Sequence, residues 1–259
     1  MSSFKILCLG DVVGADALAA LRQRLPALRK ELGADLVIVN GENARLGAGN
    51  GLTPDDAETI FAAGADVITG GNHTFAQRSI YTMLDDKPEL LRPLNCAPGC
   101  PGHGELLLNA AGTNILILNA LGRVYMDPCD DPFRSIDAAL RRYEGQYDFA
   151  VLDFHAEATS EKFAVASAFD GRIGLIFGSH THVPTADEQI LPGGSAYITD
   201  LGMCGPAASC LGVAPGCIIE KLRTGMPQRF ELSKNPITLQ GILVELSGMK
   251  AASIKRVTA

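Results

Sequence analysis

The chain has 259 residues, of which 47% are hydrophobic and 20% charged, so it can bury a sizeable core, and global disorder is disfavoured. A net charge of −7 without a long basic run argues against binding of long nucleic acid through its phosphates. It does not exclude a small nucleotide held by a metal. The N-terminus lacks the basic and apolar regions of a signal peptide, and no stretch approaches the roughly 18 apolar residues of a membrane span.

The seven cysteines are scattered and odd in number, which does not suggest a secreted disulfide framework. Cys96 and Cys100 are neighbours in a loop rich in proline and glycine, where a metal or redox pair is an alternative to two reduced thiols. We expect a soluble cytoplasmic protein that has no contact with membranes. No repeat, low-complexity tract or linker divides the sequence, so we expect a single domain over residues 1–259. Assembly into a homo-oligomer is left open.

Apolar runs alternate with helical patterns in the first third of the chain. The apolar runs predict three strands, at 5–9, 36–39 and 66–69. Leucines at three- and four-residue steps predict a helix that Gly33 ends, with Pro26 kinking or dividing it. Residues 46–51 are rich in glycine and predict a loop. Thr53, followed by proline and two acids, predicts the cap of a second helix that Gly64 closes.

The rest of the chain is less regular. Residues 88–104 are rich in proline and glycine and predict a loop. Asp131 begins a helix that reaches Gly145, and Ser160 can cap another over residues 161–169. The remaining apolar runs predict strands at 105–108, 114–118, 149–154, 173–177, 196–200 and 237–246. Strands alternating with helices predict an α/β fold with a largely parallel sheet, whose ligands bind beyond the carboxyl ends of the strands.

Five of the apolar runs end in polar groups that can bind a metal. Carboxylate, amide and imidazole donors together suit Mn, Fe or Zn better than calcium. A lone aspartate after a strand is usually a turn former, and a lone histidine is more often a core residue, but five such endings indicate a shared site. They suit two ions that share a bridging carboxylate, roughly 3.5–4 Å apart. The candidates are Asp11; Glu42 with Asn43; Asn72 with His73; His155; and His180 with His182.

These blocks resemble those of the calcineurin-like metallophosphoesterases. Two departures from the superfamily pattern, Glu42 at the bridging position and Val13 in place of a ligand histidine, resemble the bacterial YmdB-like branch. So do the segments 153–162 and 199–203. The resemblance spans residue 11 to about residue 220. It implies a four-layer α/β/β/α sandwich of two mixed β-sheets flanked by helices, the metallo-dependent phosphatase fold.

The resemblance also implies an activity and a role for each site residue. The protein would be a di-metal phosphodiesterase that hydrolyses 2′,3′-cyclic nucleotides through a metal-bridging hydroxide, with His73 as the general acid. Its cofactors would be two transition-metal ions, Fe or Mn first and Zn as a further candidate. One ion would be held by Asp11, Glu42, Asn43 and His182, and the other by Glu42, Asn72, His155 and His180.

Several further residues have expected roles near the site or at the surface. Arg45 and Thr181 are candidates for contact with the substrate phosphate. Asp200 is a candidate to support a ligand histidine, with a turn or cap role as the alternative. His103 is expected at the surface rather than on a metal. Since Val13 offers no lone pair, Asn43 is expected to replace the missing histidine.

Two other functions remain open at this point. One is a broader metal-dependent phosphatase or nuclease built on the same ligands. The other is a regulatory protein that keeps the metal site for binding. The presence of His73 favours an enzyme, because a binding protein has no need of an acid for the leaving group, and the acidic balance disfavours a processive nuclease.

Overall fold

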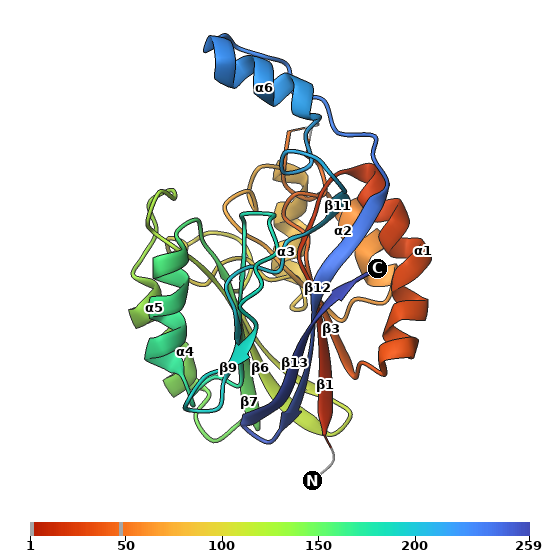
Figure 1. The fold of residues 1–259 in the computed structure, drawn as a ribbon. Helices are drawn as coiled ribbons and strands as arrows, with labels where there is room; N and C mark the ends of the chain where they lie inside the picture. The colour runs from red at the N-terminus through yellow and green to blue at the C-terminus, as the bar shows by residue number, and fades with distance from the viewer. Residues whose placement is uncertain (1–2, 47–48) are drawn as a thin grey trace.

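The computed structural model describes residues 3–46 and 49–259. Two mixed β-sheets lie face to face and helices cover their outer faces, which confirms the four-layer α/β/β/α sandwich (Figure 1). Of the predicted loop at 46–51, residues 47 and 48 lie outside the described residues. A single domain over the whole chain stays a prediction. No described helix is both long and apolar enough to cross a membrane.

The first sheet is built around the N-terminal strand β1, in the order β2-β11-β12-β1-β3-β4, with β13 paired to β12. β1 runs parallel to β3 and antiparallel to β12, so that Phe4 lies opposite Leu246. The strands are β1 (Phe4–Leu9), β2 (Asp11–Val12), β3 (Leu36–Asn40), β4 (Val67–Thr69), β11 (Met203–Pro206), β12 (Ile237–Ser247) and β13 (Lys250–Thr258).

The second sheet has the order β5-β6-β7-β8-β10-β9. Its central strands β6, β7, β8 and β10 are parallel, and the edge strands β5 and β9 are antiparallel to their neighbours. The strands are β5 (Glu105–Ala110), β6 (Thr113–Leu121), β7 (Phe149–His155), β8 (Leu175–Ser179), β9 (Gln189–Ile190) and β10 (Ala196–Ile198).

Alternation along the strands divides the apolar side chains between the layers. In β1, Ile6 and Cys8 face the second sheet and share a core with Ile117 and Val151, whereas Leu7 faces the helices. The outer face of the first sheet packs on α1 (Ala15–Leu32) and α2 (Pro54–Ala62). The outer face of the second sheet packs on α4 (Pro132–Arg142) and α5 (Thr159–Phe169).

Most helix ends follow the local sequence signals. Thr53 caps α2 in a capping box with Asp56, and Gly33 ends α1 in the left-handed conformation. Of the two predicted effects of Pro26, a kink or a division, division of the helix is wrong, because α1 continues through Pro26 and its leucines pack on the sheet on both sides of it. The kink stays a prediction. The prediction that Ser160 caps α5 is also wrong: the helix begins at Thr159, so Ser160 lies within it.

Three helical segments were not predicted from the sequence. The short η1 (Arg78–Ile80) and α3 (Tyr81–Asp86) follow one another in the connection after β4. α6 (Pro215–Thr224) has no buried residue and stands away from both sheets (Figure 1). It is carried on an arm, residues 207–234, that leaves the first sheet after β11 and returns to β12.

Candidate metal centre

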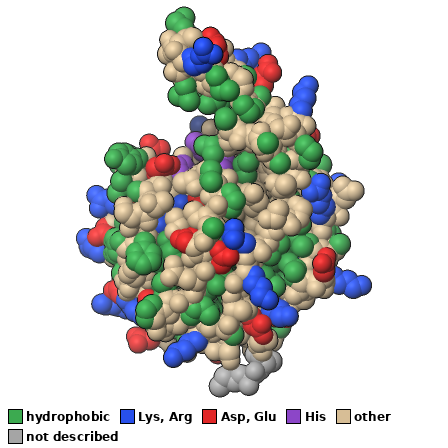
Figure 2. All heavy atoms as spheres, viewed as in Figure 1, with side chains coloured by type: hydrophobic (Ala, Val, Ile, Leu, Met, Phe, Trp, Pro, Cys, Tyr) green, Lys and Arg blue, Asp and Glu red, His purple; other side chains and the backbone are tan. Residues whose placement is uncertain are grey.

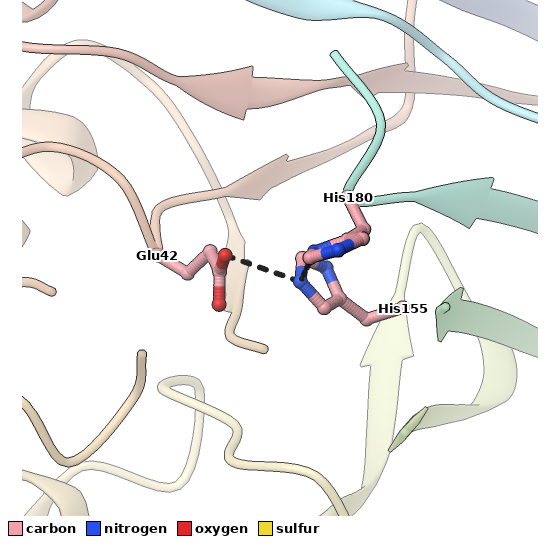
Figure 3. Close-up of side chains that lie close together, drawn as sticks. All are labelled: Glu42, His155 and His180. Carbon is pink, nitrogen blue, oxygen red and sulfur yellow. Dashed lines mark hydrogen bonds and ion pairs between the residues drawn. The ribbon is translucent and has the colours of Figure 1, made fainter. Parts of the chain in front are cut away.

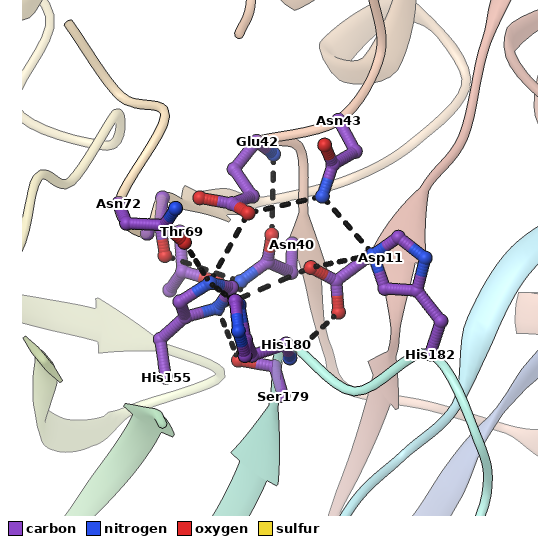
Figure 4. Close-up of polar contacts among 12 residues, drawn as sticks. Asp11, Asn40, Glu42, Asn43, Thr69, Asn72, His155, Ser179, His180 and His182 are labelled. Carbon is purple, nitrogen blue, oxygen red and sulfur yellow. Dashed lines mark hydrogen bonds and ion pairs between the residues drawn. The ribbon is translucent and has the colours of Figure 1, made fainter. Parts of the chain in front are cut away.

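The candidate ligands meet at one end of the two facing sheets. Asp11 is the first residue of β2 and His155 the last residue of β7. Glu42 and Asn43 follow β3, and His180 follows β8. Figure 4 shows these side chains converging from both sheets. The structure therefore brings together residues that are up to 171 positions apart in the sequence, from Asp11 to His182.

The first group of donors surrounds the Nε2 atom of His155. Three atoms lie 3.1 Å from it: Glu42 Oε1, Asn72 Oδ1 and His180 Nδ1. Donor atoms of Glu42, His155 and His180 lie within 4.8 Å of one another (Figure 3). Four donors that share one small volume are arranged as ligands of a single cation.

The second group lies on the other side of Glu42. Asn43 Nδ2 is 3.0 Å from Glu42 Oε1 and 3.1 Å from His182 Nε2, and His182 Nε2 is 3.8 Å from Asp11 Oδ1. A half-turn of the Asn43 amide exchanges its nitrogen for its oxygen, which is the atom that binds a cation. All seven predicted ligands thus fall into two groups that share Glu42.

A chain of hydrogen bonds fixes the orientation of the His155 ring. Its Nδ1 is 2.9 Å from the hydroxyl of Ser179, which donates to Asp153 Oδ1 at 2.6 Å. Asn40 and Thr69 also donate to Asp153. Burial raises the pKa of Asp153 to about 6, although these donors and His155 oppose the rise. With Nδ1 occupied, Nε2 of His155 is directed to the shared volume.

The histidines after β8 require an unusual backbone. His180 has φ 98° and His182 has φ 62°, values that non-glycine residues rarely adopt. Asp200 Oδ2 holds the segment by accepting from the backbone N–H and the hydroxyl of Thr181, at 3.1 and 2.8 Å. The ammonium of Lys162, which is 1% exposed, pairs with the same oxygen at 2.7 Å and donates to the Ser179 carbonyl at 2.8 Å.

The charges in the site are strongly coupled. Burial acts to lower the pKa of His155, but the carboxylates of Glu42 and Asp11 outweigh it and raise the pKa to about 9. Burial acts to raise the pKa of Glu42, but His155 outweighs it and lowers the pKa to about 2. Burial and the neighbouring His155 lower the pKa of His180 to about 3. Burial raises the pKa of Asp11.

Two observations test whether a metal fits these residues. Asp11 Oδ1 is fully buried and has no hydrogen-bond partner among the described residues, although it faces His155 Nδ1 and His182 Nε2 at 3.9 and 3.8 Å. A buried carboxylate oxygen without a partner is costly unless a cation binds it. A Cβ added at Gly71 would collide with Glu42 Oε2 and His155 Nε2. Glycine at this position therefore keeps the space beside these two donors free of a side chain. The donor set fits a metal.

The predicted catalytic residue His73 and the two predicted substrate residues, Thr181 and Arg45, do not all lie at the same cavity. His73 and Thr181 line a cavity of about 620 Å³ together with four of the candidate ligands, Glu42, Asn43, His180 and His182. The His73 ring does not join either group of donors, while its backbone N–H donates to Glu42 Oε2 at 3.0 Å. Arg45 forms an ion pair with Asp56 at 3.1 Å and lines a neighbouring cavity. Its contact with the substrate stays a prediction.

The remaining sequence candidates lie outside the two donor groups. Asp200 supports the histidine segment through Thr181 rather than through a histidine ring. His103 is exposed, as predicted. Cys96 and Cys100 are free thiols, and no candidate metal group in the described part of the chain includes them. Burial raises the pKa of Cys96 to about 11, which keeps it protonated.

Sequence reasoning gave no role to the supporting residues Asp153, Ser179 and Lys162. Asp153 interrupts an otherwise apolar strand two positions before His155, and alternate residues of a strand share a face. The position of Asp153 on the same strand face as His155 could have predicted its supporting role. Nothing in the sequence predicted the role of Lys162, because a lysine in a helix is normally exposed. Glu157, whose Oε2 lies 3.1 Å from His180 Nε2, was also missed.

The chain is similar to known proteins over almost its whole length. A family model described as YmdB-like protein matches residues 7–257. The 2′,3′-cyclic-nucleotide 2′-phosphodiesterase of Bacillus subtilis is 40% identical over 255 residues, which cover 98% of this chain and 96% of the relative. The crystal structure of a novel phosphatase from Mycoplasma pneumoniae has a TM-score of 0.92 at 37% identity, covering 100% of this chain and 94% of its own.

A more distant solved structure shares the fold alone. The 5′-nucleotidase precursor of Thermus thermophilus has a TM-score of 0.61 at 12% identity. The alignment covers 99% of this chain and 54% of that one. The two-sheet core described here is therefore found in nucleotidases as well.

Proposed function

Because the chain belongs to the YmdB-like family of calcineurin-like metallophosphoesterases, we propose that it hydrolyses 2′,3′-cyclic nucleotides to nucleoside monophosphates. It is a metal-dependent phosphoric diester hydrolase, and relatives that cover nearly the whole chain are named phosphodiesterase or phosphatase. The observation that carries the proposal is the convergence of seven candidate ligands beside His73, an imidazole that is not among them. A cytoplasmic location stays a prediction, and self-association stays open.

Two groups of residues would hold the cofactors, with Glu42 common to both. The mixture of oxygen and imidazole donors favours Fe or Mn, with Zn as a further candidate. When bound, two such ions supply a hydroxide nucleophile near neutral pH and neutralise charge on the phosphate. One group is Asp11, Glu42, Asn43 and His182; the other is Glu42, Asn72, His155 and His180.

His73 is proposed to protonate the leaving oxygen of the ribose. Its ring lines the cavity, and its backbone bond to Glu42 fixes it beside the ligands. Its Nε2 lies at the cavity wall, 3.5 Å from Asn50 Nδ2 and 3.4 Å from Asn72 Nδ2. A half-turn of the Asn50 amide would present its oxygen, which can accept from a protonated Nε2. As the phosphorus–oxygen bond breaks, a proton on Nε2 passes to the alkoxide, which leaves as a hydroxyl.

The network behind His155 holds the site in one arrangement. Ser179 and Asp153 fix the tautomer of the ring, and Glu157 approaches His180 from the side of the cavity. Preorganised groups of this kind need no rearrangement when charge develops on the phosphate. Thr181, whose hydroxyl is bound by Asp200, is proposed to limit the space available to the phosphate.

An assay panel distinguishes this function from a broader phosphatase, which the name of the Mycoplasma structure favours, and from a binding protein. The pure protein should contain up to two Mn, Fe or Zn ions per chain. It should hydrolyse 2′,3′-cyclic AMP faster than nucleoside monophosphates, lose activity with chelator and regain it with Mn. Faster hydrolysis of monoesters would favour the phosphatase. Bound metal without turnover of any ester would favour the binding protein.

A further inference from the structure

The cavity that is lined by four of the candidate ligands also has an apolar end. Six side chains form this apolar wall: Leu46, Leu211, Val213, Ile218, Phe230 and Leu232. Five of them belong to the arm. In Figure 2, histidine side chains lie in the hollow below the arm, and hydrophobic side chains lie on the arm above them. At about 620 Å³ the cavity falls within the roughly 300–1,000 Å³ of small-molecule sites.

The apolar wall is tied directly to the metal ligands. The Leu211 carbonyl lies 3.3 Å from Nδ1 of His182 and, as an acceptor, fixes that ring, while the Leu211 side chain lines the cavity. The two segments of the arm that flank α6 are joined by an isolated bridge between Val213 and Leu232 and by the bond from the Ser233 N–H to the Gly212 carbonyl, at 2.9 Å. The wall is therefore part of the same unit as the ligand His182.

The aromatic residue of the wall is presented to solvent. Phe230 is 43% exposed, and Leu211 beside the ligands is 48% exposed. The Lys221 ammonium lies 4.7 Å from the centroid of the Phe230 ring, a cation–π contact that restrains the ring. Exposed apolar side chains gathered on one side of a polar catalytic site indicate a ligand with an apolar, flat part.

We propose that the apolar wall is the nucleobase subsite of this enzyme, in which the base packs against the Phe230 ring and the Leu211 side chain while the cyclic phosphate lies at the ligands. The proposal rests on the proposed function. It follows from the two-ended cavity, because a 2′,3′-cyclic nucleotide has an anionic ring at one end and a π-system at the other. Stacking on an aromatic side chain is favourable for every base.

The chemistry of the wall also predicts its selectivity. Among the described residues that line the cavity on the arm, only Glu231 and Cys210 carry polar side-chain atoms. A site distinguishes bases through hydrogen bonds to their edges, and this wall offers few. The enzyme should therefore accept purine and pyrimidine cyclic nucleotides with similar kcat/KM values, purines being somewhat favoured by their larger stacking surface.

Kinetics with and without a base test the subsite. The substrates are 2′,3′-cyclic AMP and the 2′,3′-cyclic phosphate of methyl riboside, which has a methoxy group in place of the base. For 2′,3′-cyclic AMP, Phe230→Ala should raise KM about ten-fold with kcat within two-fold of the wild type. For the methyl riboside substrate neither constant should change. Phe230→Tyr keeps the ring and should keep the wild-type KM.

Leu222→Ala is the matched control, because Leu222 lies on the same arm, is 78% exposed and does not line the cavity. It should leave both substrates unaffected. Equal effects of Phe230→Ala on both substrates would overturn the subsite. The subsite would also be overturned if Phe230→Ala and Leu222→Ala changed the kinetic constants equally and both lost self-association. That result would assign the arm to contact between copies of the chain. If the metal-loaded wild type hydrolyses neither substrate, the proposed function itself fails, and the subsite with it.

Discussion

The Asn43 side chain lies between two other candidate ligands of the same ion. Its Nδ2 is 3.0 Å from Glu42 Oε1 and 3.1 Å from His182 Nε2. We expect Asn43 to take the place of the ligand histidine that the superfamily usually has at the position of Val13. An amide oxygen is a weaker donor than an imidazole, so the ion on the Asp11 side should be held less firmly than the ion near His155.

Asn43→Ala should therefore lower metal occupancy on the Asp11 side first. Anomalous scattering from crystals of the variant would measure the two occupancies separately. Asn43→Asp, which restores an oxygen donor, is the control and should retain both ions. Unchanged occupancy of both ions in Asn43→Ala would refute the role of Asn43.

His155 and Glu42 make the stability of the metal-free protein depend on pH. The pKa of His155 is raised from 6.5 to about 9, so its stabilisation is fully present below pH 6.5 and is lost as the pH rises through 9. The pKa of Glu42 is lowered from 4.5 to about 2, so its stabilisation is present above pH 4.5 and is lost as the pH falls through 2.

Between pH 6.5 and 9, chelator-treated protein should lose on the order of 3 kcal/mol of its free energy of unfolding, at ~1.4 kcal/mol per pKa unit. Metal-loaded protein should not show this loss, because a metal takes the place of the proton on Nε2 and binds better as the pH rises. Thermal unfolding of both forms across this range checks it. Parallel curves for the two forms would contradict the assignment of His155 as a ligand.

At the scale of elements, the segment after β8 depends on a buried ion pair. Lys162 in α5 and Asp200 after β10 are each 1% exposed at their side chains, and together they hold the segment with the two left-handed histidines. Removing one partner of a buried pair leaves the other charge uncompensated.

Lys162→Met should lower the free energy of unfolding by about 3–5 kcal/mol. It should also weaken metal binding, since the His180 backbone loses its support. Arg141→Met, which removes an exposed pair with Asp137, is the control and should change stability by less than about 1 kcal/mol. Denaturant unfolding measures both variants. Equal losses of stability in Lys162→Met and Arg141→Met would contradict the proposal that the buried ion pair supports the segment after β8.

The elements that sequence reasoning found are those with a local signal. The helix caps at Thr53 and Asp131 and the left-handed glycine at Gly33 are read from neighbouring residues, and the structure has all three. β13 was missed because charges interleave its apolar residues and because it is fixed only by pairing with β12. α6 was missed because none of its residues is buried, so that packing imposes no periodic apolar face on it.

At the scale of the molecule, non-local pairing decides both the fold and the site. Strand order places β12 beside β1, with Phe4 opposite Leu246, and no local pattern predicts that contact. Runs of apolar residues ending in ligand types indicated a shared site, but the resemblance was needed to divide the ligands and to expect two facing sheets. The network of Asp153, Ser179 and Lys162 depends on burial, which only the folded arrangement defines.

The facing sheets also separate the His73 ring, the proposed acid, from the candidate ligands. Strands of both sheets deliver their ligands to the volume between the layers, whereas His73 lies on the cavity side and contacts Glu42 only through its backbone. We therefore expect the proposed metal binding and proton donation to be separable by mutation.

The rate of 2′,3′-cyclic AMP hydrolysis by His73→Ala, measured together with its metal content, tests this separation most directly. The control is His103→Ala, which removes an exposed imidazole remote from the ligands and should match the wild type. We predict that His73→Ala retains the fold and the wild-type metal content and is slower by roughly 10²–10⁴-fold. Loss of metal from the variant would make His73 a ligand, and an unchanged rate would assign the acid to another group; either result would contradict the account.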